Sequence, residues 1–354
     1  MATAPTQPAG APVGAPGSSG DPGPQASPLL RVRDMHVHFP LGGGLFSPRR
    51  VVKAVDGVSF DIRRGSTFGI VGESGSGKST TALAVMRLVK ITSGTVHLGE
   101  AEIGALEGAS LQRERHRFQM VFQDPYASLN PRKRAGDAIL DALNLMHVGE
   151  PAQRRAQARE LFLQTGLRPE QLQLFPHQFS GGQRQRIVLA RALAARPELV
   201  VCDEPVSALD VAIQAQMLNL MLRLQREFGL TYLFISHDLG VVRHMCDEVA
   251  VMYLGRIVER AGRDALFAQP LHPYTRALWS AAPSFDPDAR SRHDRIRLQG
   301  DPPSPLAVPK GCRFAGRCPH ALPSCKETDP PLREVVPGHA VACHRVGEAG
   351  KVMY

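Results

Sequence analysis

A glycine-rich segment that ends in lysine has the residue types and spacing needed to bind phosphate. It runs from Gly72 to Thr80 and fits the pattern G-x-x-x-x-G-K-[ST]. Its glycines let backbone N–H groups surround phosphate oxygens, and a following helix adds positive potential at its N-terminus. We expect Lys78 to contact the β- and γ-phosphates and the Ser79 hydroxyl to bind Mg²⁺. The predicted nucleotide-binding residues are Gly72, Ser74, Gly75, Ser76, Gly77, Lys78, Ser79 and Thr80.

Two adjacent acids could supply the rest of the phosphate chemistry. Asp203 and Glu204 end the apolar, strand-like run 199–202, about 125 residues after the phosphate loop, as a Walker B pair would. Adjacent acids can also belong to a solvated loop, but their place at a strand end favours metal binding and catalysis. We expect Asp203 to support Mg²⁺ and Glu204 to polarise the attacking water. His237 ends another apolar strand, and ligands of α/β sheets bind at that edge.

A second glycine pair precedes a segment with helical periodicity. Ser180, Gly181, Gly182 and Gln183 come directly before the run 184–193. The Ser180 side chain can cap that helix, and the glycines leave the backbone open to an anion. This segment therefore predicts a second phosphate contact, separate from the first loop.

Together these motifs resemble those of the ATPase subunits of ABC transporters, over about residues 30–283. The resemblance implies that residues 72–80 are Walker A, that Ser180 to Gln183 form the signature motif facing a partner's nucleotide, and that Asp210 lies in the D-loop. It also implies that Gln123 binds Mg²⁺ together with Ser79 and Asp203. The implied catalytic residues are Glu204, His237 and Gln123. All of these residues are present, so we expect a competent ATPase, although Phe179 replaces the commoner leucine before Ser180.

Flanking segments resemble the oligopeptide/dipeptide importers within that family. These segments are Pro125-Tyr-Ala-Ser-Leu-Asn-Pro-Arg132 and Leu271-His-Pro-Tyr-Thr275. The resemblance implies a peripheral protein on the cytoplasmic face of the cell membrane, with a second homologous ATPase subunit in a heterodimer. It further implies two integral membrane permease subunits and an extracytoplasmic peptide-binding protein. Peptides are the expected cargo, although nickel and glutathione importers use similar subunits, and a soluble ABC ATPase acting on nucleic acid is a further alternative.

Composition limits these alternatives. The chain has 354 residues and a net charge of +9, but its basic residues are scattered and show no zinc-finger spacing. We therefore expect no nucleic-acid partner. No apolar stretch reaches the roughly 18 residues that span a bilayer. Residues 1–28 are rich in Ala, Pro and Gly and lack the features of a secretory signal, so we expect a disordered tail there.

The predicted fold class is α/β, a P-loop NTPase of the ABC ATPase type. We expect the ATPase domain to span residues 29–283, with a helical subdomain at about 124–196 and a Cys-rich extension over 284–354. Alternating residues near the start of the ATPase domain predict an antiparallel β subdomain that receives the adenine. Phe39 is the candidate for stacking on the base, and a core or loop phenylalanine is an equally weighted alternative.

Four of the six cysteines gather in the C-terminal extension: Cys312, Cys318, Cys325 and Cys343. We expect Cys202 and Cys246 to be core residues, and no disulfides in the reducing cytosol. Zinc sites usually contain close C-x₂₋₄-C pairs, which this segment lacks, so the spacing favours an iron–sulfur cluster. Zinc or no metal remain alternatives. The segment also resembles the tail of peptide-importer ATPases, some of which carry a [4Fe–4S] cluster.

Overall fold

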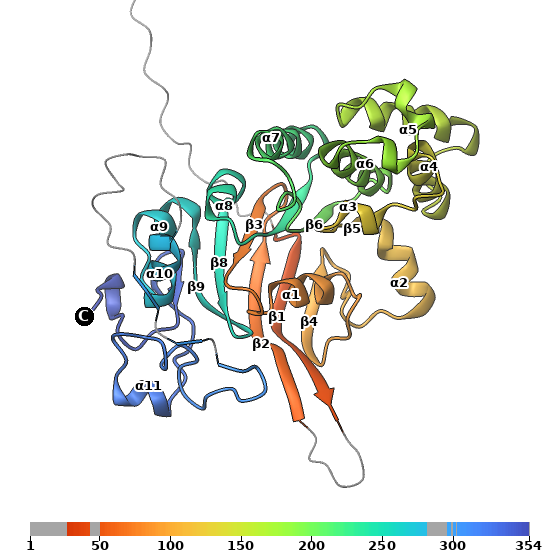
Figure 1. Ribbon diagram of the computed structural model, residues 1–354. Coiled ribbons are helices and arrows are strands. Elements are labelled where there is room, and N and C mark those ends of the chain that lie inside the picture. Colours follow the sequence, from red (N-terminus) through yellow and green to blue (C-terminus); the bar gives the residue numbers. More distant parts are fainter. Residues whose placement is uncertain (1–26, 43–49, 282–295, 299, 302, 354) are drawn as a thin grey trace, which may run out of the picture.

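A twisted central sheet organises the molecule, and one group of helices forms a separate region at one end of it (Figure 1). The computed structural model describes residues 27–42, 50–281, 296–298, 300–301 and 303–353. The strands are β1 (Leu30–Leu41), β2 (Arg50–Ile62), β3 (Thr67–Val71), β4 (Ser93–Leu98), β5 (Phe118–Val121), β6 (Leu199–Asp203), β7 (Thr231–Ile235), β8 (Glu248–Tyr253), β9 (Arg256–Gly262), β10 (Arg333–Val336) and β11 (His339–Val341). The tail predicted for residues 1–28 lies almost wholly outside this part of the chain, as does the predicted boundary at residue 283.

The helices are α1 (Lys78–Val85), α2 (Gly108–Glu114), α3 (Pro125–Ser128), α4 (Ala135–Leu145), α5 (Arg154–Gln164), α6 (Gly181–Ala194), α7 (Val211–Phe228), α8 (Leu239–Met245), α9 (Arg263–Ala268), α10 (Pro273–Ala281) and α11 (Pro323–Glu327). Short 3₁₀ turns lie at η1 (Arg115–Arg117), η2 (Pro151–Gln153), η3 (Pro169–Gln173), η4 (Pro176–Gln178) and η5 (Glu348–Gly350). Within the described residues, no helix combines the length and the apolar character needed to cross a membrane.

The main sheet has the strand order β10-β11-β9-β8-β3-β7-β6-β5 among the described residues. Strands β8, β3, β7, β6 and β5 run parallel to one another, whereas β9, β10 and β11 form only antiparallel pairs. Parallel strands are covered on both faces, which explains the continuous apolar runs in their sequences. Alternate residues of β6 enter two different cores: Val200 and Cys202 face one, and Leu199 and Val201 face the other.

A second, three-stranded antiparallel sheet has the order β2-β1-β4 and packs beside α1. Its β1–β2 ribbon extends away from the rest of the molecule in Figure 1. Alternate residues such as Val32 and Val58 are buried in one core with Phe60 and Phe68, whose rings stack 4.9 Å apart. This sheet and the helical region confirm the predicted fold class.

Helices α3 to α6 form the helical region beyond β5 and β6 (Figure 1). Ile139 and Leu143, one turn apart on α4, are fully buried in the same core as Phe162 of α5 and Ile187 of α6. This core joins the helices to the sheet, because it also contains Val121 at the end of β5. The helix that carries the second glycine pair is thereby fixed relative to the sheet.

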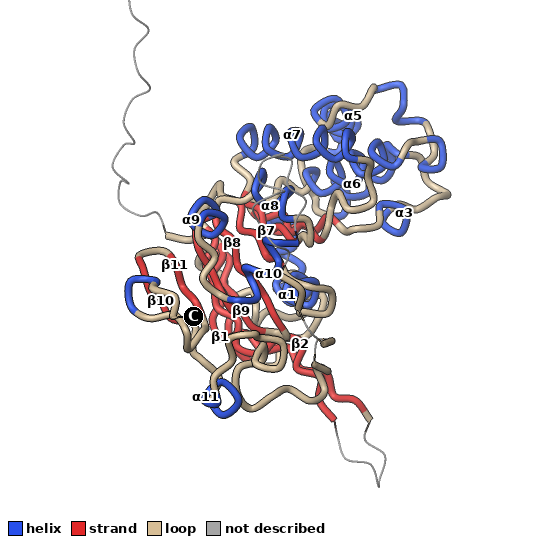
Figure 2. Tube along the Cα trace, turned by 60° about the vertical axis from the view of Figure 1, so that its left-hand side comes forward, coloured by secondary structure: helices blue, strands red, loops and turns tan. Residues whose placement is uncertain are grey.

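The C-terminal extension adds its two strands to the main sheet rather than standing apart from it. His339 to Val341 pair with β9, and β10 pairs with β11 in turn, as Figure 2 shows. The His339 ring lies 2.8 Å from Glu259, a fully buried carboxylate that also accepts hydrogen bonds from the Leu271 and His272 N–H groups. The extension is therefore anchored to the ATPase domain through a buried polar group as well as through β-pairing.

Candidate nucleotide site

The predicted ATP residues lie at the carboxyl ends of four neighbouring parallel strands. The phosphate loop follows β3, Gln123 follows β5, Asp203 and Glu204 lie at the end of β6, and His237 follows β7. These ends surround a cavity of about 640 Å³. Its lining residues are Val52, Ala54, Ser74, Gly75, Gly77, Lys78, Ser79, Thr80, Gln123, Glu204, His237 and Pro305. Ligands of parallel α/β sheets bind at this edge, where loops from adjacent strands meet.

The phosphate loop is tightly built around its lysine. The Lys78 Nζ donates to the carbonyl oxygens of Gly72 at 2.8 Å and Glu73 at 2.9 Å. Burial lowers the pKa of Lys78, and the charges of Glu204 and Asp203 act in the opposite direction. Gly77 has φ +104°, and a Cβ there would lie 2.2 Å from the Ala54 carbonyl oxygen. Glycine is therefore required for the loop to press against β2.

Two oxygen ligands suited to Mg²⁺ meet beside the loop. The Ser79 hydroxyl donates to Asp203 Oδ1 at 3.0 Å. Burial raises the pKa of Asp203; the Ser79 hydrogen bond lowers it, and the neighbouring Glu204 charge raises it further. Hydroxyl and carboxylate oxygens are the hard ligands that Mg²⁺ prefers alongside substrate phosphates. Ser79 and Asp203 therefore fit the predicted metal position, and a bound cation would compensate the buried acids.

Glu204 has a polar group on each side. Gln123 Nε2 donates to its Oε2 at 3.0 Å, and His237 Nδ1 lies 3.1 Å from its Oε1. The backbone at Glu204 has φ +47°, and its N–H donates to the Ile235 carbonyl on the adjacent strand. This fixed turn directs the carboxylate into the cavity, where it can orient a water molecule. The three predicted catalytic residues are thus brought together.

The second glycine pair lies outside this cavity. Ser180 caps α6: its hydroxyl accepts from the Gln183 N–H at 3.3 Å, and the Gln183 side chain accepts from the Ser180 N–H at 3.0 Å. A Cβ on Gly182 would lie 2.5 Å from Ile213 Cγ2, so α6 packs closely on α7 at this point. Asp210 precedes α7 as its N-cap residue. The chain does not fold these residues onto its own phosphate loop.

The cavity wall differs from the sequence expectations at four residues. Phe39 is 37% exposed on β1 and is not a lining residue, whereas Val52, its partner on β2, is. Ala54 and Pro305 also line the cavity, although no sequence pattern distinguishes them. The part of Phe39 in adenine binding remains a prediction.

Cys202 and Cys246 are fully buried, in agreement with their predicted place in the core.

The four C-terminal cysteines line one small cavity with His344. Each sulfur accepts a backbone hydrogen bond: Cys312 from Phe314, Cys318 from His320, Cys325 from Leu322 and Cys343 from Arg345. Burial raises the pKa of Cys312 to about 12 and that of Cys343 to about 11, so without a bound cation the neutral thiols are favoured. Convergent, hydrogen-bonded sulfurs fit an Fe–S or other metal centre.

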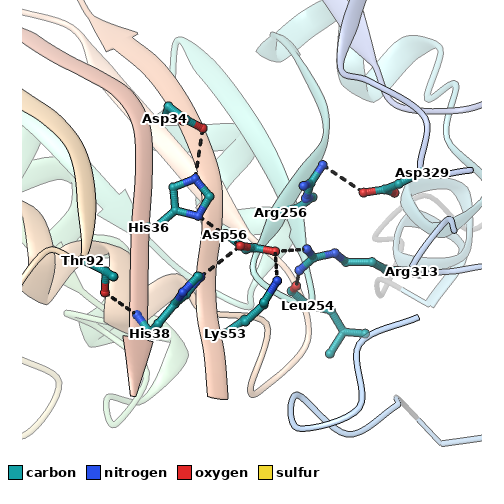
Figure 3. Close-up of polar contacts among 10 residues, drawn as sticks. All are labelled: Asp34, His36, His38, Lys53, Asp56, Thr92, Leu254, Arg256, Arg313 and Asp329. Atoms are coloured by element: carbon teal, nitrogen blue, oxygen red, sulfur yellow. Dashed lines mark hydrogen bonds and ion pairs between the residues drawn. The ribbon is translucent and has the colours of Figure 1, made fainter. Parts of the chain in front are cut away.

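A further group, His36, His38 and Asp56, has ligand atoms within 4.8 Å of one another (Figure 3). The two rings each place a nitrogen 3.0 Å from Asp56 Oδ1. Arg313 and Lys53 contact the other Asp56 oxygen, so two cationic side chains already compensate the carboxylate. This arrangement stabilises an ion-pair network and offers a divalent cation little net negative charge.

The fold and this site define a P-loop ATPase cassette, and comparisons with known proteins agree. Residues 55–207 match the family described as ABC transporter, and residues 258–325 match the oligopeptide/dipeptide transporter C-terminal region. The oligopeptide transport ATP-binding protein AppF of Bacillus subtilis is 51% identical over 319 residues, covering 89% of this chain and 97% of AppF. The dipeptide transport ATP-binding protein DppF of Escherichia coli is 46% identical over 321 residues, covering 91% and 95%.

Solved structures support the same assignment. CbiO1 of Clostridium perfringens, part of an ABC transporter complex, matches with a TM-score of 0.60 at 25% identity, covering 69% of this chain and 92% of that chain. A dimeric ATP-binding cassette bound to ADP and phosphate matches with a TM-score of 0.59 at 27% identity, covering 66% and 98%. The chain belongs to the ATP-binding subunits of ABC transporters, with the C-terminal region of the oligopeptide/dipeptide type. It is an ATPase.

Proposed function

We propose that this chain powers the import of di- and oligopeptides as the ATP-hydrolysing subunit of an ABC transporter. One observation carries the proposal: Lys78, Ser79, Gln123, Glu204 and His237 line one cavity in a chain that also has the peptide-transporter C-terminal region, and Asp203 lies beside it, hydrogen-bonded to Ser79. AppF and DppF, which are named for oligopeptide and dipeptide transport, match along almost their whole length. These relatives favour peptides over nickel or glutathione as cargo.

Catalysis in this proposal needs two cassettes. Lys78 and the loop N–H groups would bind the phosphates. Ser79 and Asp203, with Gln123 nearby, would hold Mg²⁺, which would supply positive charge to offset that of the phosphates. Glu204 accepts a hydrogen bond from the attacking water and its proton as the water adds in line. Ser180 and the α6 N-terminus lie outside this cavity. We therefore propose that they complete the nucleotide site of a second, homologous cassette.

The remaining partners follow from the family. The subunit would bind two integral membrane permease subunits on the cytoplasmic face of the membrane, with a peptide-binding protein on the other side. Closure of the ATPase pair on ATP, and its release after hydrolysis, would drive the permeases between two states. The ATPase pair is proposed to be a heterodimer.

Transport by the reconstituted complex tests the cargo. The chain, its ATPase partner, the permeases and the binding protein are placed in vesicles with ATP, and uptake of a labelled tripeptide is measured. We expect peptide uptake that is lost with Lys78→Ala in this chain and in its partner's equivalent lysine. Uptake of nickel or glutathione in place of peptide would overturn the proposed cargo. Hydrolysis stimulated by nucleic acid without permeases would favour the soluble alternative.

We also propose that Cys312, Cys318, Cys325 and Cys343 hold a [4Fe–4S] cluster. Two observations support this proposal: the four cysteines line one small cavity, and their sequence spacing lacks the close C-x₂₋₄-C pairs usual in zinc sites. Such a cluster would crosslink C-terminal segments that bury few apolar residues.

Metal analysis of anaerobically purified protein tests the cluster. We expect about four iron atoms per chain and broad absorbance near ~400 nm. Replacing any one of the four cysteines by serine should remove both signals, whereas Cys246→Ala, outside the quartet, should retain them. A full equivalent of zinc without iron would identify a zinc site instead, and the absence of both metals would leave four ordinary thiols.

A further inference from the structure

The loop between the first two cysteines of the quartet carries two buried arginines. Arg313 directly follows Cys312 and Arg317 directly precedes Cys318, and their side chains are only 5% and 9% exposed. Each arginine pairs with an acid from the nucleotide-binding part of the chain. Buried arginine–carboxylate pairs fix geometry strongly, because the guanidinium can donate two hydrogen bonds in one plane.

Arg317 binds the phosphate loop itself. Its NH1 donates to Glu73 Oε2 at 2.7 Å and its NH2 donates to Glu73 Oε1 at 3.2 Å. Glu73 is the second residue of the phosphate loop, and its carbonyl oxygen accepts from Lys78 Nζ at 2.9 Å. The residue clamped by Arg317 is therefore one that holds the phosphate-binding lysine in place.

A buried tyrosine holds the same residue from its backbone. The Glu73 N–H donates to Tyr274 Oη at 2.8 Å, and Tyr274 is fully buried near the start of α10. Its ring lies 4.7 Å from Tyr253 and 5.4 Å from Phe314, which belongs to the same loop as the arginines. Side chain, N–H and carbonyl of Glu73 are thus all engaged, and two of these contacts come from outside the ATPase motifs.

Arg313 contacts β2, the strand beside the phosphate loop (Figure 3). It donates to Asp56 Oδ2 and to the Leu254 carbonyl oxygen. Asp56 lies on β2, two residues beyond Ala54, which lines the cavity and contacts Gly77 of the phosphate loop. The segment between Cys312 and Cys318 therefore contacts both β2, which lies beside the phosphate loop, and the phosphate loop itself.

We propose that Arg317 is a positioning residue for nucleotide binding, through which the cysteine-bearing extension presets the phosphate loop. Held at its side chain and its N–H, Glu73 keeps its carbonyl in place, and Lys78 stays oriented toward the incoming phosphates. This inference rests on the proposed nucleotide site and adds to it a dependence on residues more than 200 positions away in the sequence. No nucleotide motif predicts that dependence.

Nucleotide affinity of the isolated full-length chain tests the proposal without requiring hydrolysis. Binding of ATP with Mg²⁺ is measured by calorimetry for wild type, Arg317→Gln and Arg317→Lys. We expect Kd to rise on the order of tenfold in Arg317→Gln, within the usual range for coupled sites. The Kd of Arg317→Lys should lie between those of wild type and Arg317→Gln, because lysine restores the charge but not the paired hydrogen bonds. Arg33→Gln is the matched control, since Arg33 makes a similar two-bond pair with Asp61 that touches neither loop.

Folding and coupling are checked in the same proteins. Each variant is first melted to establish that it is folded at the assay temperature. Glu73→Gln should weaken binding about as much as Arg317→Gln, and the double variant should be no weaker, because both changes break one contact. Unchanged affinity in folded Arg317→Gln, or full additivity in the double variant, would overturn the proposal. If Lys78→Ala also left affinity unchanged, the nucleotide site itself would be wrong.

Discussion

At the scale of single residues, the chemistry depends on where Glu204 is held. Its carboxylate has Gln123 on one side and His237 on the other, and its backbone adopts a left-handed conformation at a strand end. Such a conformation costs free energy for a residue other than glycine, which the N–H bond to Ile235 helps to offset. The strain is located at the acidic residue that we propose to be catalytic.

Replacing this acid by its amide should separate hydrolysis from binding. Glu204→Gln keeps the size of the side chain but removes the proton acceptor, so turnover should fall by about 10²–10⁴. ATP affinity should remain, because Lys78 and the loop amides are intact. The measurement is phosphate release by the assembled transporter, alongside direct ATP binding, with Glu227→Gln on the exposed face of α7 as the control. Wild-type turnover in Glu204→Gln would remove this residue from the catalytic role.

At the scale of elements, β2 links the nucleotide cavity to the C-terminal extension. Burial by itself would raise the pKa of Asp56, but hydrogen bonds from Arg313 and His38 and the charge of Lys53 outweigh it and hold the pKa far below its ordinary value. A carboxylate with a depressed pKa stabilises the folded state above its unfolded pKa, and that contribution disappears as the pH falls toward the folded pKa. The strand is thus stabilised by charge at neutral pH.

Asp56→Asn should therefore reduce stability in a pH-dependent way. At pH 7 the loss should be about 3 kcal/mol, because Arg313 keeps its charge in a buried position without its partner. The difference in free energy of unfolding between wild type and variant should have its full size at pH 5. It should narrow below about pH 4, where the carboxylate of the unfolded chain is protonated. Urea unfolding across this range measures it, with exposed Asp61→Asn on the same strand as the control. A gap of constant size from pH 5 to pH 3 would contradict this account.

At the scale of the whole molecule, the two segments predicted to bind phosphate do not share one cavity. Lys78 lies in this chain's own cavity, whereas Ser180 and its helix lie outside it. In the proposed arrangement, a functional unit needs a second cassette whose signature segment covers this cavity. The unit of catalysis is then an assembly, although the unit of nucleotide binding is one chain.

Two substitutions distinguish these roles. Lys78→Ala should abolish most ATP affinity of the isolated chain, because it removes the charge that contacts the phosphates. Ser180→Arg should leave that affinity unchanged, yet it should disable hydrolysis at the partner's site once the transporter is assembled. Calorimetry on the isolated chain measures the ATP affinity, and ATPase assays on the complex measure the rate of hydrolysis. Equal loss of affinity in the two isolated variants would contradict the shared-site arrangement.

The ATP motifs could be predicted from the sequence because their chemistry is local. A phosphate loop needs only consecutive glycines, a lysine and a hydroxyl between a strand and a helix, all within nine residues. Glu204, Gln123 and His237 could be named from their motifs, but their mutual distances could not.

Tertiary structure decided everything that depends on strand order and long-range pairing. The order β3-β7-β6-β5 brings four strand ends to one cavity although they are spread along the chain from β3 to β7. Likewise, Arg317 and Glu73 lie 244 positions apart, and the sequence around either residue does not predict their contact. Sequence patterns report the local backbone and the side chains it presents, whereas a contact between distant segments exists only once burial and β-pairing have fixed both in space.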